Sequence, residues 1–490
     1  MKAPVIPAEL GASTTLVQAK GSGGIDSLDG PFGMEESYLS IPQHPLGIKP
    51  SGNKYTAASN AKDSINPFQV FPDEILAIFL EYLDPTQLRL LGSTCRFLST
   101  QSKSGSFTWR GTWRSTLLNL EKSQLSHISC DNVFSDVLHR PFLCTHTPLA
   151  PYASNIPARN AISRLENLSH AEFSESWSDK PFILTKPVRE WPVFKSWDTQ
   201  ALLEQYGDVK FRAEAVDWSL KTYADYMQDS NDESPLYLFD RSFVENMNLQ
   251  VGDRQESPLY WIPECFGEDL FEVLGNQRPD NKWLIIGPAR SGSTYHKDPN
   301  ATSAWNAVLR GSKYWIMFPS SGSTPPPPGV YVSEDQSEVT SPLSITEWLL
   351  GFHAEARKTP GCIEGVCNEG EILHVPSGWW HLVVNLEASI AITQNFVPRS
   401  HLPEVLTFLK ENIADQVSGF KKEVTDPYGI FVQGMKKQHP EVLEQALDEL
   451  KKKAEGKKRK WDAAVGNQNG ETNGGGFSFG FGGDSDEEIP

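Results

Sequence analysis

The sequence is short of three things: positive charge, clustered cysteine and long apolar runs. It has 44 Lys and Arg residues against 62 Asp and Glu, which gives a formal net charge of −18. Such an acidic chain as a whole repels a phosphate backbone, so direct binding to nucleic acid is not expected, although the net charge does not exclude a local basic patch. No apolar run approaches the length of a membrane span, and residues 1–7 lack the apolar segment of a signal peptide. We therefore expect an intracellular protein with no membrane partner.

Six cysteines are scattered through the 490 residues, and only Cys362 and Cys367 lie close together. A single C-x4-C pair does not supply the four ligands of a structural zinc site. Free thiols in a reducing compartment are the simpler interpretation. The hydrophobic fraction of 39% is below that of ordinary globular chains, while Trp and Phe are plentiful, at 14 and 25. This combination indicates an aromatic-rich folded part beside unfolded segments.

The N-terminal region divides into an aperiodic segment and a helical one. Residues 1–66 are rich in Gly, Ser, Pro and Ala and predict a disordered leader. In residues 67–115, Pro72 stands at a helix start and apolar residues follow at helical spacing. These apolar residues are Ile75, Phe79 and Leu83. A small helical domain that buries this stripe is the plain interpretation.

The same helical segment resembles a known adaptor. Its Phe-Pro-Asp-Glu-Ile-Leu, Tyr-Leu-Asp-Pro and Cys-Arg-Phe-Leu motifs, with a later Trp, are similar to those of an F-box. The F-box family is a three-helix adaptor that docks on a Skp-type subunit of cullin ubiquitin ligases. The resemblance therefore implies a Skp-type partner for residues 67–115.

Short apolar runs separated by turn residues dominate residues 162–397, which follow a connector of mixed pattern over 116–161. Many short strands with turn signals between them predict an all-β sandwich or jelly roll. The expected strands are 180–185, 236–240, 283–286, 313–318, 370–375, 381–385 and 390–396. Ser169 and Glu172 have the spacing of a capping box at a helix start. The Pro325–Pro328 run and the polar stretch to about residue 342 predict an insertion loop.

The pattern becomes helical after Pro398. Apolar residues at helical spacing predict C-terminal helices over 398–453, which either pack on the β domain or form a dimer surface. Residues 454–490 predict a disordered tail that is basic at first and acidic at its end. The basic block, residues 451–460, is either a solvated helix end or a nuclear-import signal. We expect the nucleus as the main location, with the cytoplasm as a second one.

The centre of the β region is a segment in which His296 and Asp298 stand two positions apart. Side chains at i and i+2 of an extended strand share a face, so this imidazole and this carboxylate can reach one point. One more imidazole would complete a two-histidine, one-carboxylate facial triad, which holds Fe(II) and leaves coordination positions open. His381 follows a Val-Pro-Ser-Gly-Trp-Trp turn and is the best placed. His374, which lies inside a strand, is its competitor.

Three motifs around these histidines resemble JmjC-domain oxygenases. They are Gly-Ser-Thr-Tyr-His-Lys-Asp-Pro-x-x-Thr-Ser-Ala-Trp-Asn, Gly-Ser-Lys-Tyr-Trp-x-x-Phe-Pro and Val-Pro-Ser-Gly-Trp-Trp-His-x-Val-x-Asn-Leu. The closest likeness is to the phosphatidylserine-receptor-like subgroup, linked to protein lysyl hydroxylation and arginine demethylation. The resemblance over residues 162–397 implies a double-stranded β-helix of the cupin type, with Fe(II), 2-oxoglutarate as cosubstrate and O2.

The resemblance also implies roles for individual residues. His296, Asp298 and His381 would hold the iron, and Lys313 would pair with the distal carboxylate of 2-oxoglutarate. A lysine inside a barrel is strongly destabilising unless an anion meets it. The alternative for Lys313 is an exposed lysine on an edge strand. Residues that match cosubstrate contacts are Asn306, Ser293, Thr393 and Tyr237, with Asn395 and Phe239 as further pocket positions.

Several of these assignments leave alternatives open. Ser293 stands where relatives usually have threonine, and its hydroxyl can make the same hydrogen bond. The other polar and aromatic pocket residues are also ordinary occupants of a strand. The region over residues 319–370 is longer than in near relatives, and an F-box ahead of a JmjC domain is unusual for animal members of the family. These differences leave the substrate open.

The resemblance implies oxidation of a protein side chain, with hydroxylation favoured over removal of an N-methyl group. Both reactions use one kind of active site, so the motifs do not choose between them. A rival interpretation is an F-box adaptor of a ubiquitin ligase whose cupin domain is a non-catalytic reader. A small-molecule cupin enzyme is disfavoured because the long helical extensions suit a macromolecular partner.

Overall fold

The computed structural model describes residues 136–251, 259–320, 324–333, 338–342, 344–411 and 417–466, with isolated positions between 42 and 87. The chain separates into two units, residues 1–40 and 41–490, and every described residue belongs to the second. Apart from these isolated positions, the predicted F-box over 67–115 and the predicted leader therefore lie outside the described residues, as does the acidic end of the tail.

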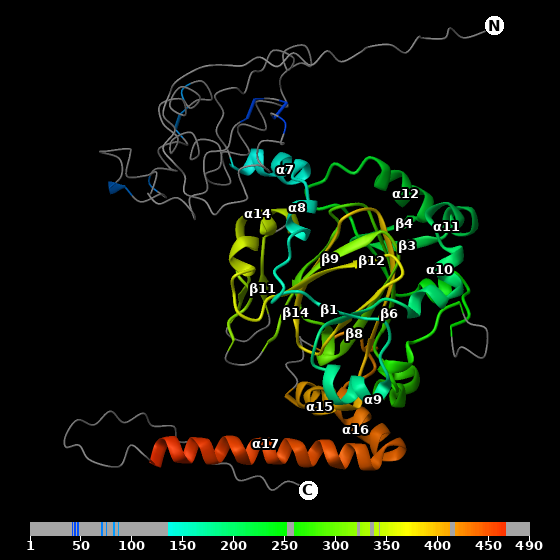
Figure 1. Ribbon diagram of the computed structural model, residues 1–490, viewed down its shortest axis with the longest axis vertical. Coiled ribbons are helices and arrows are strands. Elements are labelled where there is room, and N and C mark those ends of the chain that lie inside the picture. Colours follow the sequence, from blue (N-terminus) through cyan, green and yellow to red (C-terminus); the bar gives the residue numbers. More distant parts are fainter. Residues whose placement is uncertain are drawn as a thin grey trace. The chain divides into compact units, whose positions relative to one another are not determined.

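The described chain is built on two β-sheets (Figure 1). The strands of the first lie in the order β1 (Ser163–Leu165), β2 (Phe182–Leu184), β13 (Ile372–Val375), β8 (Ser303–Arg310), β15 (Ser389–Phe396), β6 (Lys282–Gly287), β5 (Leu238–Asp240), β3 (Lys210–Ala213) and β4 (Val216–Ser219). Those of the second lie in the order β12 (Ile363–Asn368), β9 (Ser312–Phe318), β14 (Trp380–Asn385) and β7 (Gly292–His296). From β6 to β9, and again from β12 to β15, successive strands alternate between the two sheets. Such alternation is typical of a jelly roll or cupin-like core.

The side chains of β9 show how the second sheet is built. Lys313, Trp315 and Met317 point to the inside, where the two latter pack with residues of the first sheet. Tyr314 and Ile316 point to the opposite face and pack with another cluster. Both faces of the strand are covered, so it reads as a nearly continuous apolar run rather than as an alternating one.

A helix that the sequence did not predict covers the outer face of this second sheet. It is α14 (Ile345–Ala356), and it follows a hairpin of β10 (Tyr331–Val332) and β11 (Val339–Thr340). Trp348 and Leu349 of α14 are buried against Tyr295, Ile316 and Leu382. The predicted insertion loop, which ends at about residue 342, therefore contains this hairpin, and the packed helix follows it.

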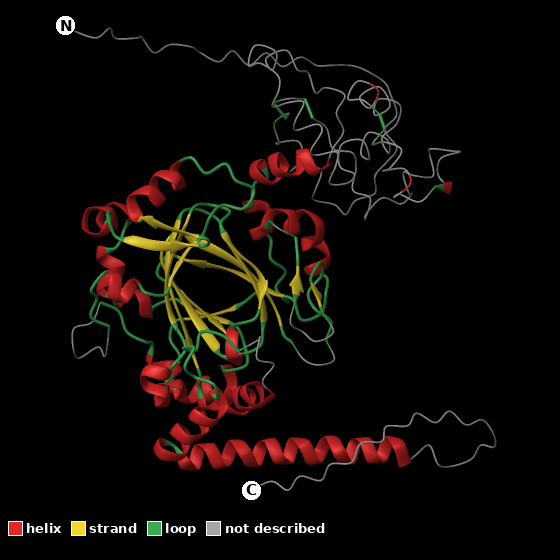
Figure 2. Cartoon of the chain, turned by 180° about the vertical axis from the view of Figure 1, so that it is seen from behind, coloured by secondary structure: helices red, strands yellow, loops and turns green. Residues whose placement is uncertain are grey.

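Helices cover the outer face of the first sheet (Figure 2). They are α9 (His170–Glu172), the π-helix η3 (Phe173–Trp177), α10 (Pro192–Ser196), α11 (Thr199–Tyr206), α12 (Leu220–Gln228) and α13 (Phe243–Asn246), with the 3-10 helices η4 (Pro187–Glu190) and η6 (Glu264–Phe266). The expected capping box at α9 is confirmed. Its Ser169 hydroxyl accepts from the backbone N–H of Glu172 at 3.2 Å, and the Ser169 N–H donates to the Glu172 carboxylate at 3.0 Å.

The C-terminal helices pack on the β domain, one of the two arrangements expected for them. They are α15 (Leu402–Glu411), α16 (Pro427–Gln438) and α17 (Pro440–Gly466), preceded by the 3-10 helix η9 (Arg399–His401). Phe431 and Leu406 are buried with Phe271 of the 3-10 helix η7 (Leu270–Gln277). The last helix continues past the predicted boundary at residue 453 to Gly466, because the basic block has no proline and its one glycine, Gly456, costs only about 1 kcal/mol.

The described part of the connector is fixed to the β domain by an ion pair between the partly buried Arg357 and the buried Glu364. This part comprises α7 (Asp136–His146) and α8 (Ala150–Ala153). The Arg357 side chain donates to both carboxylate oxygens of Glu364 at 2.9 and 3.1 Å, and to the carbonyl oxygens of Tyr152 and Ser154 at 2.7 and 2.9 Å. The Tyr314 hydroxyl also donates to Glu364, which is fully buried. Within the described chain, no helix is both long and apolar enough to cross a membrane.

Candidate iron and cosubstrate site

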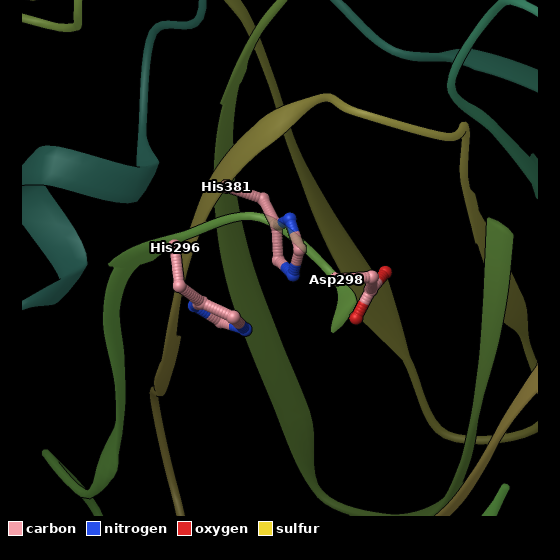
Figure 3. A group of neighbouring side chains, drawn as sticks. All are labelled: His296, Asp298 and His381. Carbon is pink, nitrogen blue, oxygen red and sulfur yellow. The ribbon is translucent and has the colours of Figure 1, made fainter. Parts of the chain in front are cut away.

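Strand pairing brings the two histidines of the predicted triad together. β7 and β14 are antiparallel neighbours, and their register places His296 directly opposite His381, with ring centroids 4.1 Å apart. Asp298 lies just beyond the end of β7, where the backbone is still extended at φ −62° and ψ 146°. One potential ligand atom from each of the three side chains lies within 4.8 Å of the other two (Figure 3).

Both imidazoles have one nitrogen engaged and one available. Nδ1 of His296 is 2.8 Å from the carbonyl oxygen of Thr294, and Nδ1 of His381 is 3.0 Å from that of Trp379. A carbonyl only accepts, so each Nδ1 is assigned as the protonated donor, which leaves the lone pair on Nε2. Burial and the neighbouring His296 hold the pKa of His381 well below its usual value. A neutral imidazole oriented by its second nitrogen is the usual form of a metal-binding histidine.

The third member of the cluster, Asp298, is positioned by a strained turn. The 3-10 helix η8 (Pro299–Ala301) follows it, with Asn300 and Ala301 at φ 55° and 54°. The Asn300 side chain fixes the turn by two hydrogen bonds with the backbone of Ser418, at 2.9 and 3.1 Å. The Ser377 hydroxyl donates to the Ala301 carbonyl at 2.6 Å.

Asp298 as a whole is only partly buried, but its Oδ2 atom is buried and lacks any hydrogen-bond partner. Burial raises its pKa, against the opposing effects of His296 and of a hydrogen bond from Asn395. A buried carboxylate oxygen without a donor is strongly unfavourable unless a cation meets it. Two imidazoles oriented through Nδ1 and one such carboxylate therefore fit a divalent metal ion of the Fe(II) type.

The competitor, His374, does not join this group. It is fully buried on β13, stacks on Phe182 at 4.9 Å and approaches the carbonyl oxygen of Lys180 with Nδ1 at 3.2 Å. These contacts belong to the aromatic cluster between the first sheet and its helices. His374 thus faces away from the interior in which the other two histidines meet.

A cavity of about 420 Å³ opens between the two sheets beside the metal cluster. Its wall includes the predicted cosubstrate and pocket residues other than Lys313. These are Asn306, Ser293, Thr393, Tyr237, Asn395 and Phe239. Thr393 is directly opposite Asn306 across β15 and β8, and its hydroxyl donates to the Trp305 carbonyl at 2.8 Å. The side-chain Oδ1 of Asn306 is buried without a partner, so a donor from a bound molecule can satisfy it.

Lys313 lies behind the cavity wall and is fully buried, which excludes the exposed edge-strand alternative. Its Nζ donates to the Tyr237 hydroxyl at 2.8 Å and to Asn385 Oδ1 at 2.7 Å. Both acceptors are neutral, and burial lowers the pKa of Lys313 to about 7. Met317 of β9 pairs with His381, and Lys313 lies four residues before Met317 on the same strand. Lys313 and Met317 are therefore roughly 13 Å apart along the strand.

Two residues of this region were missed by sequence reasoning. Asn385 positions the lysine: its amide Nδ2 donates to the Ser291 hydroxyl at 2.9 Å, which turns its oxygen toward Lys313. The sequence signal that could have identified Asn385 is its position at the end of the Trp-Trp-His-x-Val-x-Asn motif. Glu214 lines the cavity from a turn far away in the sequence, and no sequence signal pointed to it.

Comparison with known proteins agrees with this geometry. Residues 171–401 match the model of the cupin-like domain family. The chain is 36% identical to Arginine-specific demethylase JMJ22 of Arabidopsis thaliana over 87% of this chain and 88% of the relative. It is 33% identical to Bifunctional arginine demethylase and lysyl-hydroxylase psr-1 of Caenorhabditis elegans over 49% of this chain and 62% of the relative. With 2-oxoglutarate and iron-dependent oxygenase JMJD4 of Danio rerio, the identity is 27% over 40% of this chain and 43% of the relative. The chain therefore belongs to the JmjC family of cupin-like, iron- and 2-oxoglutarate-dependent oxygenases.

Proposed function

We propose that this protein uses Fe(II), 2-oxoglutarate and O2 to oxidise a side chain of a protein substrate, with His296, Asp298 and His381 as the iron ligands. The observation that carries the proposal is the convergence of these three side chains within 4.8 Å. The fixed Nδ1 hydrogen bonds and the unpartnered Asp298 oxygen support it, because both leave ligand atoms aimed at one point. Because all three residues line the cavity, they would hold the ion from one side and leave its opposite side accessible.

Lys313 is proposed to bind the distal carboxylate of 2-oxoglutarate. In the free protein its ammonium has only neutral acceptors, so a dianion is the partner that best offsets its desolvation. Tyr237 and Asn385 hold the amine in place. Asn306, Ser293 and Thr393 offer polar atoms in the wall of the cavity that the metal cluster also lines.

When bound, the iron with 2-oxoglutarate and O2 supplies oxidation of a C–H bond, coupled to release of succinate and carbon dioxide. The chain contributes position and exclusion of water. Trp315, Ile285 and Val383 form apolar wall between the polar groups, which keeps bulk solvent from the reacting atoms. Asp298 and the two histidines fix which direction remains open to substrate.

The substrate is proposed to be a lysine or arginine side chain of a protein. The names of the JMJ22 and psr-1 relatives support this, since they describe an arginine demethylase and a bifunctional arginine demethylase and lysyl-hydroxylase. Oxidation of a methylene group gives a stable alcohol. Oxidation of an N-methyl group gives an unstable carbinolamine that releases formaldehyde. The two outcomes differ only in which C–H bond the protein presents, and we favour hydroxylation.

Mass measurement on synthetic peptides tests this proposal. Peptides carrying lysine or methylarginine are incubated with the full-length protein, Fe(II), 2-oxoglutarate and air. We expect a peptide to gain one oxygen atom, or to lose one methyl group with release of formaldehyde, together with succinate. Peptide modification that continues after a chelator has removed the metal would contradict the proposal.

We also propose that the F-box-like segment over 67–115 binds a Skp-type subunit, and that the protein enters the nucleus through its basic block. The F-box-like motifs described above support binding to a Skp-type subunit, and the exposed Lys451, Lys452 and Lys453 on α17 support entry into the nucleus.

No observation on the described residues favours a non-catalytic reader over an oxygenase.

A further inference from the structure

The rim of the cavity holds an acidic side chain that the proposed chemistry does not use. Glu214 lies in the two-residue turn between β3 and β4 and is exposed. Its Oε1 accepts a hydrogen bond from the backbone N–H of Tyr237 at 3.2 Å. Within the part of the chain that the structure describes, its other carboxylate oxygen accepts none. The carboxylate is therefore held at the cavity with one oxygen free.

The backbone of Glu214 indicates that this position is constrained. The residue has φ 49°, a left-handed conformation that glycine adopts readily and glutamate does not. Glu214 is the first residue of a two-residue hairpin turn. When the first residue of such a turn has a positive φ and the second does not, that first residue is usually glycine. An unfavourable backbone conformation at the edge of a cavity is a reason to look for function. Here the conformation places a carboxylate beside Tyr237.

Two aromatic rings share the same rim. Phe239 on β5 and Trp283 on β6 have ring centroids 5.5 Å apart with an angle of 37° between the rings. The Phe239 side chain is 38% exposed, which is unusual for a large apolar residue that lines a cavity. Aromatic faces at an accessible rim attract cations through the quadrupole of the ring.

Charge balance distinguishes Glu214 from the other ionisable groups. In the proposed complex, the charges of Fe(II), Asp298, 2-oxoglutarate and Lys313 cancel. Among the described residues that line the cavity, none is Lys or Arg. Glu214 therefore leaves the assembled site with one uncompensated negative charge, in a cavity wall that also holds the exposed Phe239 and the partly buried Trp283.

We propose that Glu214, Phe239 and Trp283 bind the cationic head of the substrate side chain. The carboxylate supplies the counter-charge, and the two rings supply apolar faces that a guanidinium, its N-methyl groups or an ammonium can pack against. The site thus selects lysine and arginine side chains, methylated or not, against neutral side chains of the same length. This inference rests on the proposed function, because it assumes that iron and 2-oxoglutarate occupy the inner part of the cavity.

Peptide binding without turnover tests the inference. The full-length protein is loaded with Fe(II) and 2-oxoglutarate under anaerobic conditions and titrated calorimetrically with capped Gly-Xaa-Gly peptides. Xaa is lysine, methylarginine, norleucine or citrulline. We expect each cationic peptide to bind about tenfold more tightly than its neutral counterpart, with a preference that shrinks as salt rises.

Variants at the rim assign the preference to particular residues. Glu214→Gln keeps the shape of the side chain and removes its charge, and it is expected to bring the cationic and neutral peptides to similar affinities. Trp283→Leu is expected to weaken the cationic peptides several-fold. Glu175→Gln, an equal charge change at an exposed position that does not line the cavity, is the matched control and is expected to keep the full preference.

The visible charge-transfer band of the iron–2-oxoglutarate complex separates the failure of the inference from that of the proposed function. A wild-type protein with the band but with equal affinity for all four peptides would overturn the inference alone. Absence of the band in the wild type would overturn the proposed function. Loss of the band in Glu214→Gln would overturn the inference as well, since Glu214 would then support the inner site.

Discussion

Replacing Asp298 by alanine is expected to remove iron-dependent turnover altogether. The change leaves two imidazoles and no anionic ligand at the point where three ligand atoms meet. Loss of a group that only orients a ligand already weakens metal binding by about 10- to 100-fold, so loss of the ligand itself should exceed that. The measurement is Fe(II)-dependent consumption of 2-oxoglutarate, with the iron content of the purified variant determined in parallel.

Histidine variants supply the matched control for Asp298→Ala. His381→Ala should lose iron in the same way, whereas His374→Gln should keep both iron and turnover. His374 and His381 are both buried, on the successive strands β13 and β14. Only His381 faces His296. Full turnover in Asp298→Ala, or loss of iron in His374→Gln with the fold intact, would contradict the ligand assignment.

Replacing Lys313 by methionine is expected to weaken 2-oxoglutarate binding by at least about 100-fold. The thioether fills much of the same space but offers no charge to the distal carboxylate, which would then be buried without a cation. Iron binding should persist, because Lys313 is separated along β9 from the position opposite His381. Equilibrium binding of 2-oxoglutarate to the iron-loaded protein measures the effect, and an unchanged dissociation constant would rule out the proposed role.

The pH dependence of 2-oxoglutarate binding follows from the same lysine. Burial lowers the pKa of Lys313 to about 7 in the free protein, so below that pH it is charged and ready to bind the dianion. Above pH 7 binding must also take up a proton, and the affinity should fall by up to about tenfold per pH unit. In a Lys313→Arg variant that binds 2-oxoglutarate, this slope should disappear, because the guanidinium stays charged.

The stability of the free protein should rise with pH, whereas the affinity for 2-oxoglutarate falls. Between pH 7 and the unfolded pKa near 10.5, the unfolded chain binds a proton that the folded chain does not. The contribution of Lys313 to the free energy of unfolding therefore rises with pH across this window. Bound 2-oxoglutarate should reduce this rise, since the anion keeps the lysine charged.

The parts of the site that sequence reasoning could name are those with a local signal. His296 and Asp298 are close in the chain, and His381 follows a distinctive turn, so the structure had only to bring the two segments together. The strand register that places His381 opposite His296 has no local signal, because it is set by packing of the whole sheet. Lys313 could also be singled out from the sequence, because a lysine among apolar strand residues needs an anion to offset its burial.

What sequence reasoning missed lay where tertiary contacts override local pattern. α14 follows a proline-rich, polar stretch, and its burial depends on the outer face of a sheet formed elsewhere in the chain. Glu214 gains its position only when the turn between β3 and β4 meets Tyr237. The F-box expected over 67–115 lies outside the described residues except for isolated positions, and it stays a prediction.

The most direct test of the central claim is the visible spectrum of the purified full-length protein after anaerobic addition of Fe(II) and 2-oxoglutarate. If His296, Asp298 and His381 hold the iron and Lys313 anchors the cosubstrate, a metal-to-ligand charge-transfer band will appear. The band will be absent in His296→Ala and weakened in Lys313→Met. No band from the well-folded wild-type protein, or an undiminished band from His296→Ala, would contradict the account.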